Sequence, residues 1–227
     1  MLSDLLLLEA CLAPAGPEIA GIKLAVLSRP SHDTRTDVAI ALLDVDDPRR
    51  WMDELEPEPV KFNSLGFVLE ALTDGMMELY RYVVGLPAFV DEGEYNIHLT
   101  GFGVGGGRAY LLAGLLLEDG HRIASLVTFG APKPGAGQLA SKLNVLHSNR
   151  WYRNGLDIMP LIPEVPWAMG SDPFRHPGLK MQLNHEISLN TMGWHDPIAY
   201  RNALARLDPQ PGVVAATGEL HGVGWQF

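Results

Sequence analysis

A glycine-rich turn with the sequence GFGVGG, at residues 101–106, has residue types and a spacing that could serve chemistry. Through Gly101, Gly103 and Gly106 it spells G-x-G-x-x-G, which is typical of a turn that binds the pyrophosphate of a dinucleotide. The same letters fit the strand-to-helix turn that carries the nucleophile of many hydrolases, with small residues two before and two after the nucleophile. In that second interpretation, Gly103 stands at the nucleophile position.

The surrounding residues favour the hydrolase turn. A dinucleotide fold requires an acidic residue about 20 residues after the turn, at the end of the second strand. Asp119 lies near that distance but before the strand, and the strand ends in TFGAPKPG (residues 128–135), which has no carboxylate. Nucleotide binding is therefore the remote alternative, and a glycine turn without any chemistry is another.

Hydrophobic patterns predict an α/β fold around this turn. Residues 96–100 and 123–129 are expected to form strands, and residues 105–118 an apolar helix between them, which is the basic unit of a parallel sheet. We expect a central, mostly parallel sheet with helices on both faces. The remaining expected elements are a short first helix, strands at 22–27, 38–43 and 149–153, and helices at 66–84, 138–146 and 197–207.

Composition narrows the possible partners. The chain has 227 residues, of which 47% are hydrophobic, so we expect one domain over residues 1–227 with a sizeable core. A net charge of −10 without a basic block argues against binding nucleic acid or anionic membranes. The single cysteine, Cys11, excludes an internal disulfide and is expected to be buried.

No targeting, membrane or metal signal stands out. Asp4 and Glu9 interrupt the apolar start, and no run approaches the roughly 18 apolar residues of a membrane span. We therefore expect a soluble, cytoplasmic protein without a signal peptide. No pair among the eight histidines has the spacing of a metal site, so neither a metal nor another cofactor is expected.

Three ordered motifs, TGFGVGG, TFGAPKPG and YRNGLDIMPLIP, resemble those of the class 3 (fungal-type) lipases of the α/β-hydrolase superfamily. That family has a T-G-H-S-L-G-G elbow, then T-F-G-x-P-x-x-G, then D-I-V-P-x-x-P. Trp51 and the HDPIAY stretch at 195–200 extend the resemblance, which spans roughly residues 5–205 and leaves the tail at 209–227 outside. It implies an α/β-hydrolase fold and ester hydrolysis.

The resemblance also implies site residues. A hydrolase of this kind uses a serine nucleophile, a histidine base and an orienting carboxylate, in the chain order nucleophile, Asp, His. These roles fall on position 103, Asp157 and His195, with His185 as the fallback base. Taken alone, Asp157 also fits an aspartate that caps the turn before Pro160.

Two departures from the family pattern affect catalysis. Gly103 has no side chain, so no acyl-enzyme can form there, and loss of such a nucleophile costs on the order of a millionfold in rate. Counting back six residues from Trp51, the family's F-R-G-[S/T] stretch falls on residues 42–45, where Val45 replaces the hydroxyl and Asp44 adds a carboxylate. The backbone N–H groups of Val104 and Val45 are the oxyanion donors that are expected to remain.

Several accounts of this site stay open. In one, the chain is a natural pseudoenzyme with a binding or assembly role. In another, it is an active lipase or esterase deliberately inactivated by a serine-to-glycine change at position 103. In a third, His195 activates a water molecule directly. The expected ligand is a small ester or a lipid-like molecule. The segment at residues 52–65, where the family has its lid, is short and acidic, which argues against activation at a lipid surface and favours a small or soluble ester. A protein partner or a homo-oligomer is also possible.

Overall fold

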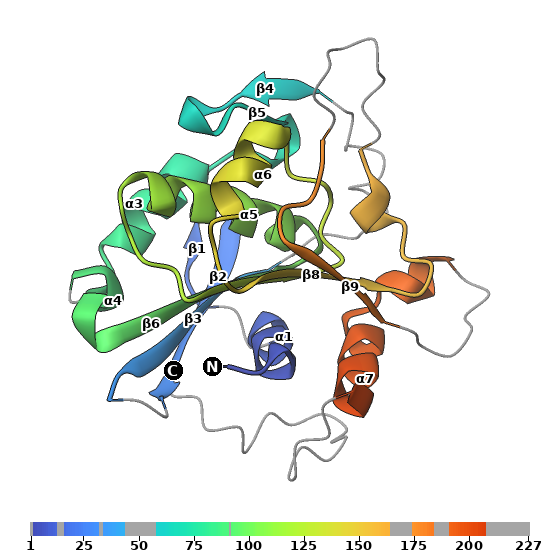
Figure 1. The fold of residues 1–227 in the computed structure, drawn as a ribbon, viewed down its shortest axis with the longest axis horizontal. Helices are drawn as coiled ribbons and strands as arrows, with labels where there is room; N and C mark the ends of the chain where they lie inside the picture. The colour runs from blue at the N-terminus through green and yellow to red at the C-terminus, as the bar shows by residue number, and fades with distance from the viewer. Residues whose placement is uncertain are drawn as a thin grey trace.

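A seven-stranded sheet with the order β1-β2-β3-β6-β7-β8-β9 forms the centre of the protein (Figure 1). This computed structural model describes residues 2–12, 16–31, 34–43, 58–90, 92–163, 174–183 and 191–207. Strands β3 to β9 of this sheet run parallel, while β1 and β2 are antiparallel additions at one edge. A separate antiparallel pair, β4 and β5, lies outside the central sheet.

The elements have the following bounds. The strands are β1 (Glu18–Ile19), β2 (Ile22–Pro30), β3 (Thr36–Leu43), β4 (Pro59–Lys61), β5 (Phe67–Leu69), β6 (Tyr95–Phe102), β7 (Ser125–Phe129), β8 (Asn149–Asn154) and β9 (Leu179–Leu183). The α-helices are α1 (Asp4–Leu12), α3 (Met76–Val84), α4 (Pro87–Val90), α5 (Gly103–Glu118), α6 (Gly137–Leu143) and α7 (Pro197–Leu207). Short 3-10 turns are η1 (Asn63–Leu65), η2 (Glu70–Leu72), η3 (Glu92–Glu94), η4 (Met159–Leu161) and η6 (Thr191–His195).

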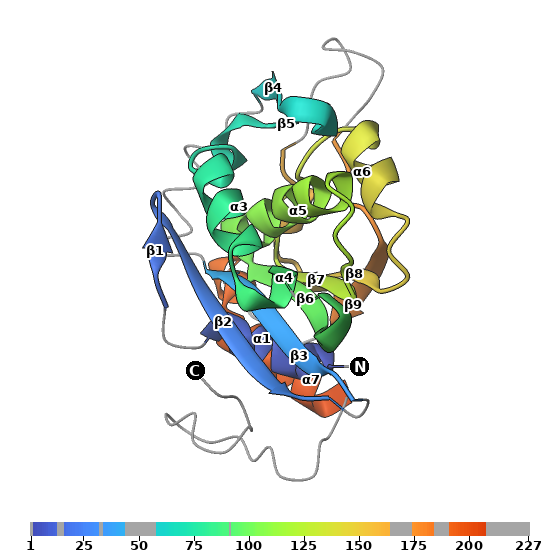
Figure 2. The same ribbon diagram turned by 90° about the vertical axis from the view of Figure 1, so that its left-hand side faces the viewer.

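Helices cover both faces of the sheet. Helices α1 and α7 lie on one face, and α3, α4, α5 and α6 lie on the other (Figures 1 and 2). Strand β3 shows how the two cores form, because successive side chains of a strand point to opposite faces. Val38, Ile40 and Leu42 join the core under α5, and the alternate residues from Ala39 to Leu43 join the core under α1. Because β3 is buried on both faces, its sequence contains the continuous apolar run VAIALL.

The predicted fold class is confirmed, and most predicted elements occur within a few residues of their expected bounds. The helix expected at 66–84 is wrong in its first half. Residues 67–69 form β5, residues 70–72 form η2, and Gly75 adopts a left-handed φ of 72° before α3 begins. Val68, Leu69 and Leu72 are buried as the pattern requires, whereas Phe67 is 54% exposed, and strand pairing with β4 determines the local backbone.

The sequence pattern does not predict strand β9, because its apolar and polar residues alternate weakly and most of them are exposed.

The tail at 209–227 lies outside the described residues. The Cys11 thiol donates to the Leu7 carbonyl at 3.4 Å and lies 3.5 Å from the Thr100 hydroxyl. Burial raises the pKa of this thiol to about 12. None of the helices in the described ranges is long and apolar enough to span a lipid bilayer.

Helix α5 packs unusually close to strand β3, and Gly105 permits the contact. A Cβ atom at Gly105 would lie 2.2 Å from the carbonyl oxygen of Leu42, which belongs to the strand backbone. Neither backbone can yield without moving the helix or the strand. This crossing explains why residue 105 must be small, as the predicted hydrolase turn also requires at that position.

We predict that Gly105→Ala lowers the free energy of unfolding by about 3 kcal/mol, because overpacking against a rigid backbone is the costly kind of core substitution. Urea unfolding followed by circular dichroism measures this loss. Gly93→Ala is the matched control, because a Cβ atom there meets nothing within 4 Å. Similar stabilities for the two variants would show that α5 does not approach β3 this closely.

Candidate active site

The glycine turn joins β6 directly to α5. Strand β6 ends at Phe102, and the helix begins at Gly103, whose φ of 55° is left-handed. A Cβ atom at Gly101 would lie 2.5 Å from the carbonyl group of Gly105, so the chain doubles back too tightly for a larger residue there. A strained, sharp turn of this kind is what presents a nucleophile at the carboxyl edge of a hydrolase sheet.

A buried histidine–aspartate pair lies beside this turn. His195, at the end of η6, places its Nδ1 2.9 Å from Oδ2 of Asp157, which follows β8. Asp157 is fully buried, and His195 is 4% exposed. Since the carboxylate oxygen can only accept, we assign the imidazole proton to Nδ1. This tautomer leaves the lone pair on Nε2, as a general base requires.

Two further donors hold the Asp157 carboxylate. The Tyr200 hydroxyl, from α7, donates to Oδ2 at 2.6 Å, and the Met159 backbone N–H donates to Oδ1 at 2.9 Å. Burial, followed by the charge of Asp157, raises the pKa of Tyr200 well above its ordinary value, so its hydroxyl keeps its proton. Three donors thus orient the carboxylate toward the imidazole.

The His195 ring lies against both glycine turns. Its centroid is 4.8 Å from that of Phe102, the last residue before Gly103. A Cβ atom at Gly130 would lie 2.8 Å from Cε1 of His195. Because Phe102 and Phe129 are register partners in neighbouring parallel strands, Gly103 and Gly130 begin adjacent turns. Within the described residues, Nε2 of His195 is buried without a hydrogen-bond partner.

The turn between β8 and Asp157 positions both members of the pair. Asn154 is fully buried; its carbonyl accepts from the Asp157 N–H at 2.9 Å, and its side-chain amide donates to the Trp194 carbonyl at 3.4 Å. Gly155, with a φ of 47°, lies under the Trp194 ring, where a Cβ atom would come within 2.0 Å. The sequence motifs do not predict a role for these two residues, although an Asn-Gly pair is a recognisable turn signal.

Of the other predicted site residues, the structure describes Val104 but not Val45 or His185. Val104 is the second residue of α5 and is buried. Val45 and His185 lie outside the described residues, as does Asp44. His176 stacks on Trp151 with ring centroids 4.1 Å apart, and its Nε2 contacts the Pro160 carbonyl at 2.9 Å.

The dinucleotide interpretation receives no support from the geometry. Asp119 caps the end of α5 opposite the glycine turn, and a helix of 16 residues is about 24 Å long. A carboxylate that far away cannot bind the ribose of a nucleotide whose phosphates lie at the turn. Among the described residues, no group of three or more His, Cys, Asp or Glu side chains is arranged to hold a metal ion.

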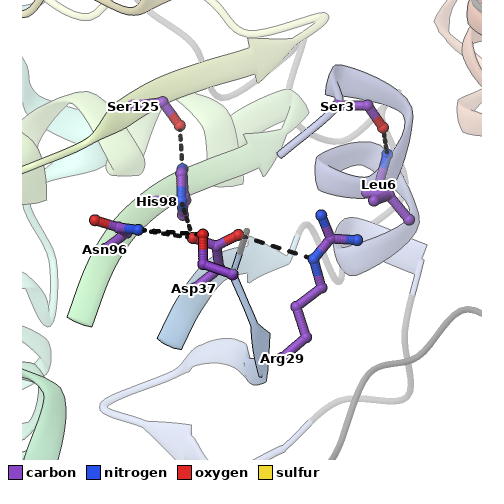
Figure 3. Close-up of polar contacts among 8 residues, drawn as sticks. Ser3, Leu6, Arg29, Asp37, Asn96, His98 and Ser125 are labelled. Atoms are coloured by element: carbon purple, nitrogen blue, oxygen red, sulfur yellow. Dashed lines mark hydrogen bonds and ion pairs between the residues drawn. The ribbon is translucent and has the colours of Figure 1, made fainter. Parts of the chain in front are cut away.

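A second histidine lies in a buried polar cluster at the opposite end of the same strands (Figure 3). His98, on β6, contacts the Ser125 hydroxyl through Nδ1 at 2.7 Å and Asp37 Oδ1 through Nε2 at 3.5 Å. Asn96 donates to the same Asp37 oxygen at 3.0 Å, and Arg29 forms an ion pair with Asp37 at 3.9 Å. The cluster therefore links strands β2, β3, β6 and β7.

This cluster differs from a catalytic triad despite its residue types. The ring nitrogens are reversed, because Nδ1 faces the serine and Nε2 faces the carboxylate. Ser125, His98 and Asp37 are each at most 2% exposed. The serine also lies at the start of β7, away from any strand-to-helix turn. We interpret the cluster as a set of buried contacts that fixes the register of the parallel strands.

The cluster predicts acid sensitivity. Burial lowers the pKa of His98 below its ordinary 6.5, against an opposing effect of Asp37, while Arg29 and the chain's α-amino group lower it further. Burial raises the pKa of Asp37, but hydrogen bonds from Asn96 and Ser31, together with the interaction with His98, lower it below 3.8. Because the folded state disfavours the proton on His98, its stabilisation is complete above pH 6.5 and is lost as the pH falls below that value.

We expect the free energy of unfolding to fall between pH 7 and pH 5 by up to about 1.4 kcal/mol per pH unit for this one group. His98→Gln should be less stable at pH 7 but should show a smaller slope. Urea unfolding at several pH values measures both quantities. An unchanged slope in the variant would show that His98 is not the group responsible.

A model of the lipase (class 3) family matches residues 45–167, which is more than half of the chain. A search of curated proteins finds no match. The chain is similar to a Rhizomucor miehei lipase propeptide complex, a deletion mutant, with 22% identity over 76% of this chain and 55% of that chain, and a TM-score of 0.62.

Other solved structures have similar folds. The Rhizomucor miehei triacylglyceride lipase is 20% identical over 75% of this chain and 65% of its own, with a TM-score of 0.61. A mutant of MDLA from Penicillium cyclopium is 15% identical over 84% of both chains, with a TM-score of 0.59. The chain thus covers only 55% to 65% of the Rhizomucor chains, and at these identities the likeness establishes the fold.

Proposed function

Because the chain belongs to the class 3 lipase family of α/β-hydrolases, we propose that it is an ester-hydrolase scaffold that supplies no nucleophile of its own and binds its ligand without hydrolysing it. One observation carries this proposal. The buried His195–Asp157 pair lies against a sharp strand-to-helix turn whose central residue is Gly103. The base and its orienting carboxylate are present, and the side chain that they would activate is not.

The chemistry of ester hydrolysis explains why such a site is inactive. The family mechanism begins when a hydroxyl oxygen attacks the ester carbonyl and gives its proton to histidine. Gly103 offers no atom for this attack. We further propose Val104 and Val45 as the backbone oxyanion donors, with Val104 favoured by its place in the positive first turn of α5.

The ligand that we propose is a small ester or a lipid-like molecule. An ester carbonyl fits a turn at the N-terminal end of a helix, because that end carries partial positive charge. The absence of a hydroxyl at position 103 then leaves the ester intact after binding. The role of the protein is accordingly to bind or present the ligand.

A second candidate function is favoured by the same pair. Three donors still orient Asp157, and His195 still has the tautomer of a working base. An esterase inactivated by a serine-to-glycine change would retain all of these contacts. The residue that the gene of origin encodes at position 103 distinguishes this candidate from a natural pseudoenzyme.

The proposal is tested by assaying the unmodified protein with p-nitrophenyl butyrate in alcohol-free buffer. We expect p-nitrophenol release no faster than that of the His195→Gln variant. We also expect the non-hydrolysable ketone analogue of the ester to bind in calorimetry and to bind more weakly to that variant. Hydrolysis at an enzymatic rate would show that the proposal of a non-catalytic scaffold is wrong.

A further inference from the structure

The imidazole of His195 has one nitrogen whose hydrogen-bonding capacity is unused within the described residues. Nδ1 is hydrogen-bonded to Asp157, but Nε2 is buried without a partner, and the side chain is 2% exposed. A buried polar atom without a partner destabilises a fold by about 1–3 kcal/mol, and native structures satisfy nearly all such atoms. The unused nitrogen therefore indicates a place for a polar group of a ligand.

The tautomer of His195 restricts what that group can be. In the neutral imidazole with its proton on Nδ1, Nε2 accepts a hydrogen bond, so a ligand that binds this form must donate one. A carboxylate cannot donate, and it would place its charge against the imidazole lone pair. An ammonium can donate, but it would have to be buried beside the positive N-terminal end of α5, which begins at Gly103.

A hydroxyl group satisfies both neighbours. Its proton can be donated to Nε2 of His195, and its oxygen can face the partial positive charge at the start of α5. It is neutral, so burial carries no charge penalty. Gly103 lacks a side chain, and a serine at that position would have supplied this same group in the family pattern.

We propose that the turn at Gly103 binds a small alcohol, with its hydroxyl hydrogen-bonded to Nε2 of His195 in the place of a serine hydroxyl. This inference rests on the proposed function, because it requires that the chain supply no nucleophile of its own. It adds a ligand class, the hydroxyl compound, to the ester already proposed. The site then holds two ligands, one of which brings the group that the chain lacks.

The arrangement allows an acyl transfer when an activated ester is also present. The alcohol oxygen forms a bond to the ester carbonyl carbon, and its proton passes to Nε2 of His195, while Asp157 stays ionised. The bond from that carbon to the original alkoxy group then breaks, and the departing oxygen takes the proton from Nε2. The products are a new ester of the added alcohol and the original leaving alcohol, and no other reactant is needed.

Methanol is the probe for binding. The Nε2 and Hε1 resonances of His195 are followed by NMR while methanol is added to the unmodified protein. We expect a saturable shift of these resonances and no comparable shift in Gly103→Ser, whose own hydroxyl takes the place. A shift that is linear in methanol, or equal in the two proteins, would overturn the proposal.

Methanol is also the probe for transfer. With p-nitrophenyl acetate as the ester, we expect methanol to increase p-nitrophenol release at least tenfold with saturation, and methyl acetate to appear in equal amount. His195→Gln should lose this increase, and Gly103→Ala should reduce it because a methyl group takes the space of the alcohol. Release that is independent of methanol in the unmodified protein would contradict the proposed function, whereas an absence of methyl acetate would contradict only this inference.

Discussion

Gly103→Ser is expected to raise the rate of p-nitrophenyl butyrate hydrolysis by a factor on the order of 10³ over the unmodified protein. The serine hydroxyl would complete a set whose histidine and carboxylate are already buried and oriented. Restoring a nucleophile to an otherwise complete triad is worth on the order of 10⁶. The expected loss of the hydroxyl oxyanion donor, whose position is occupied by Val45, lowers that figure by about 10²–10³.

The control variants separate a new nucleophile from a general change of the turn. Gly103→Ala introduces the same left-handed backbone strain at φ 55° without a hydroxyl, and it should show no gain. The double variant with His195→Gln should also lose the gain. A fluorophosphonate probe should label Gly103→Ser and neither control. If Gly103→Ser showed no increase in the rate of ester hydrolysis, the remainder of the site would not be competent for that reaction.

The fold could be predicted where local pattern and tertiary contacts agree. The strand, turn and helix around Gly103 were recognised because the glycines mark a change from strand to helical periodicity. The segment from Phe67 to Leu72 has apolar residues spaced three or four apart, which predicts a helix. That spacing does not distinguish a helix from a short strand followed by a 3-10 turn, and pairing with β4 decides between them.

The candidate site could be predicted only in part. Ordered motifs led to Asp157 and His195, and the structure brings these residues together at 2.9 Å, although their catalytic role stays a prediction. The supporting contacts were not predictable in the same way. Tyr200 is 43 residues from Asp157 in the chain, and the hydrogen bond between them depends on how α7 packs against the sheet.

The two ends of the sheet explain how the His195–Asp157 geometry is maintained with glycine at position 103. At one end, the His98 cluster fixes the register of strands β3, β6 and β7. At the other end, the same strands finish at the turns of Gly103 and Gly130, which contact His195. None of these contacts involves a side chain at position 103, so packing and hydrogen bonds hold the pair whether or not the site is catalytic.

Asp157→Ala is therefore expected to lower the free energy of unfolding by about 3–5 kcal/mol, although the unmodified protein is proposed to be non-catalytic. Removing the carboxylate leaves His195 Nδ1, the Tyr200 hydroxyl and the Met159 N–H without their acceptor in a buried place. Loss of one partner from a buried hydrogen-bonded pair has this magnitude. Urea unfolding measures the change, and a thermal midpoint lower by about 10 °C should accompany it.

The exposed residue Asp74 provides the control for this prediction, because its replacement by alanine should change stability by no more than about 0.5 kcal/mol. Asp157→Asn should fall between the two, since the amide keeps one acceptor oxygen but presents a donor to one of its three neighbours. If Asp157→Ala lost less than about 1 kcal/mol, the carboxylate would not be held by these donors. The residue would then be a remnant of catalysis, whereas a large loss would identify it as a structural centre that persists for the stability of the fold.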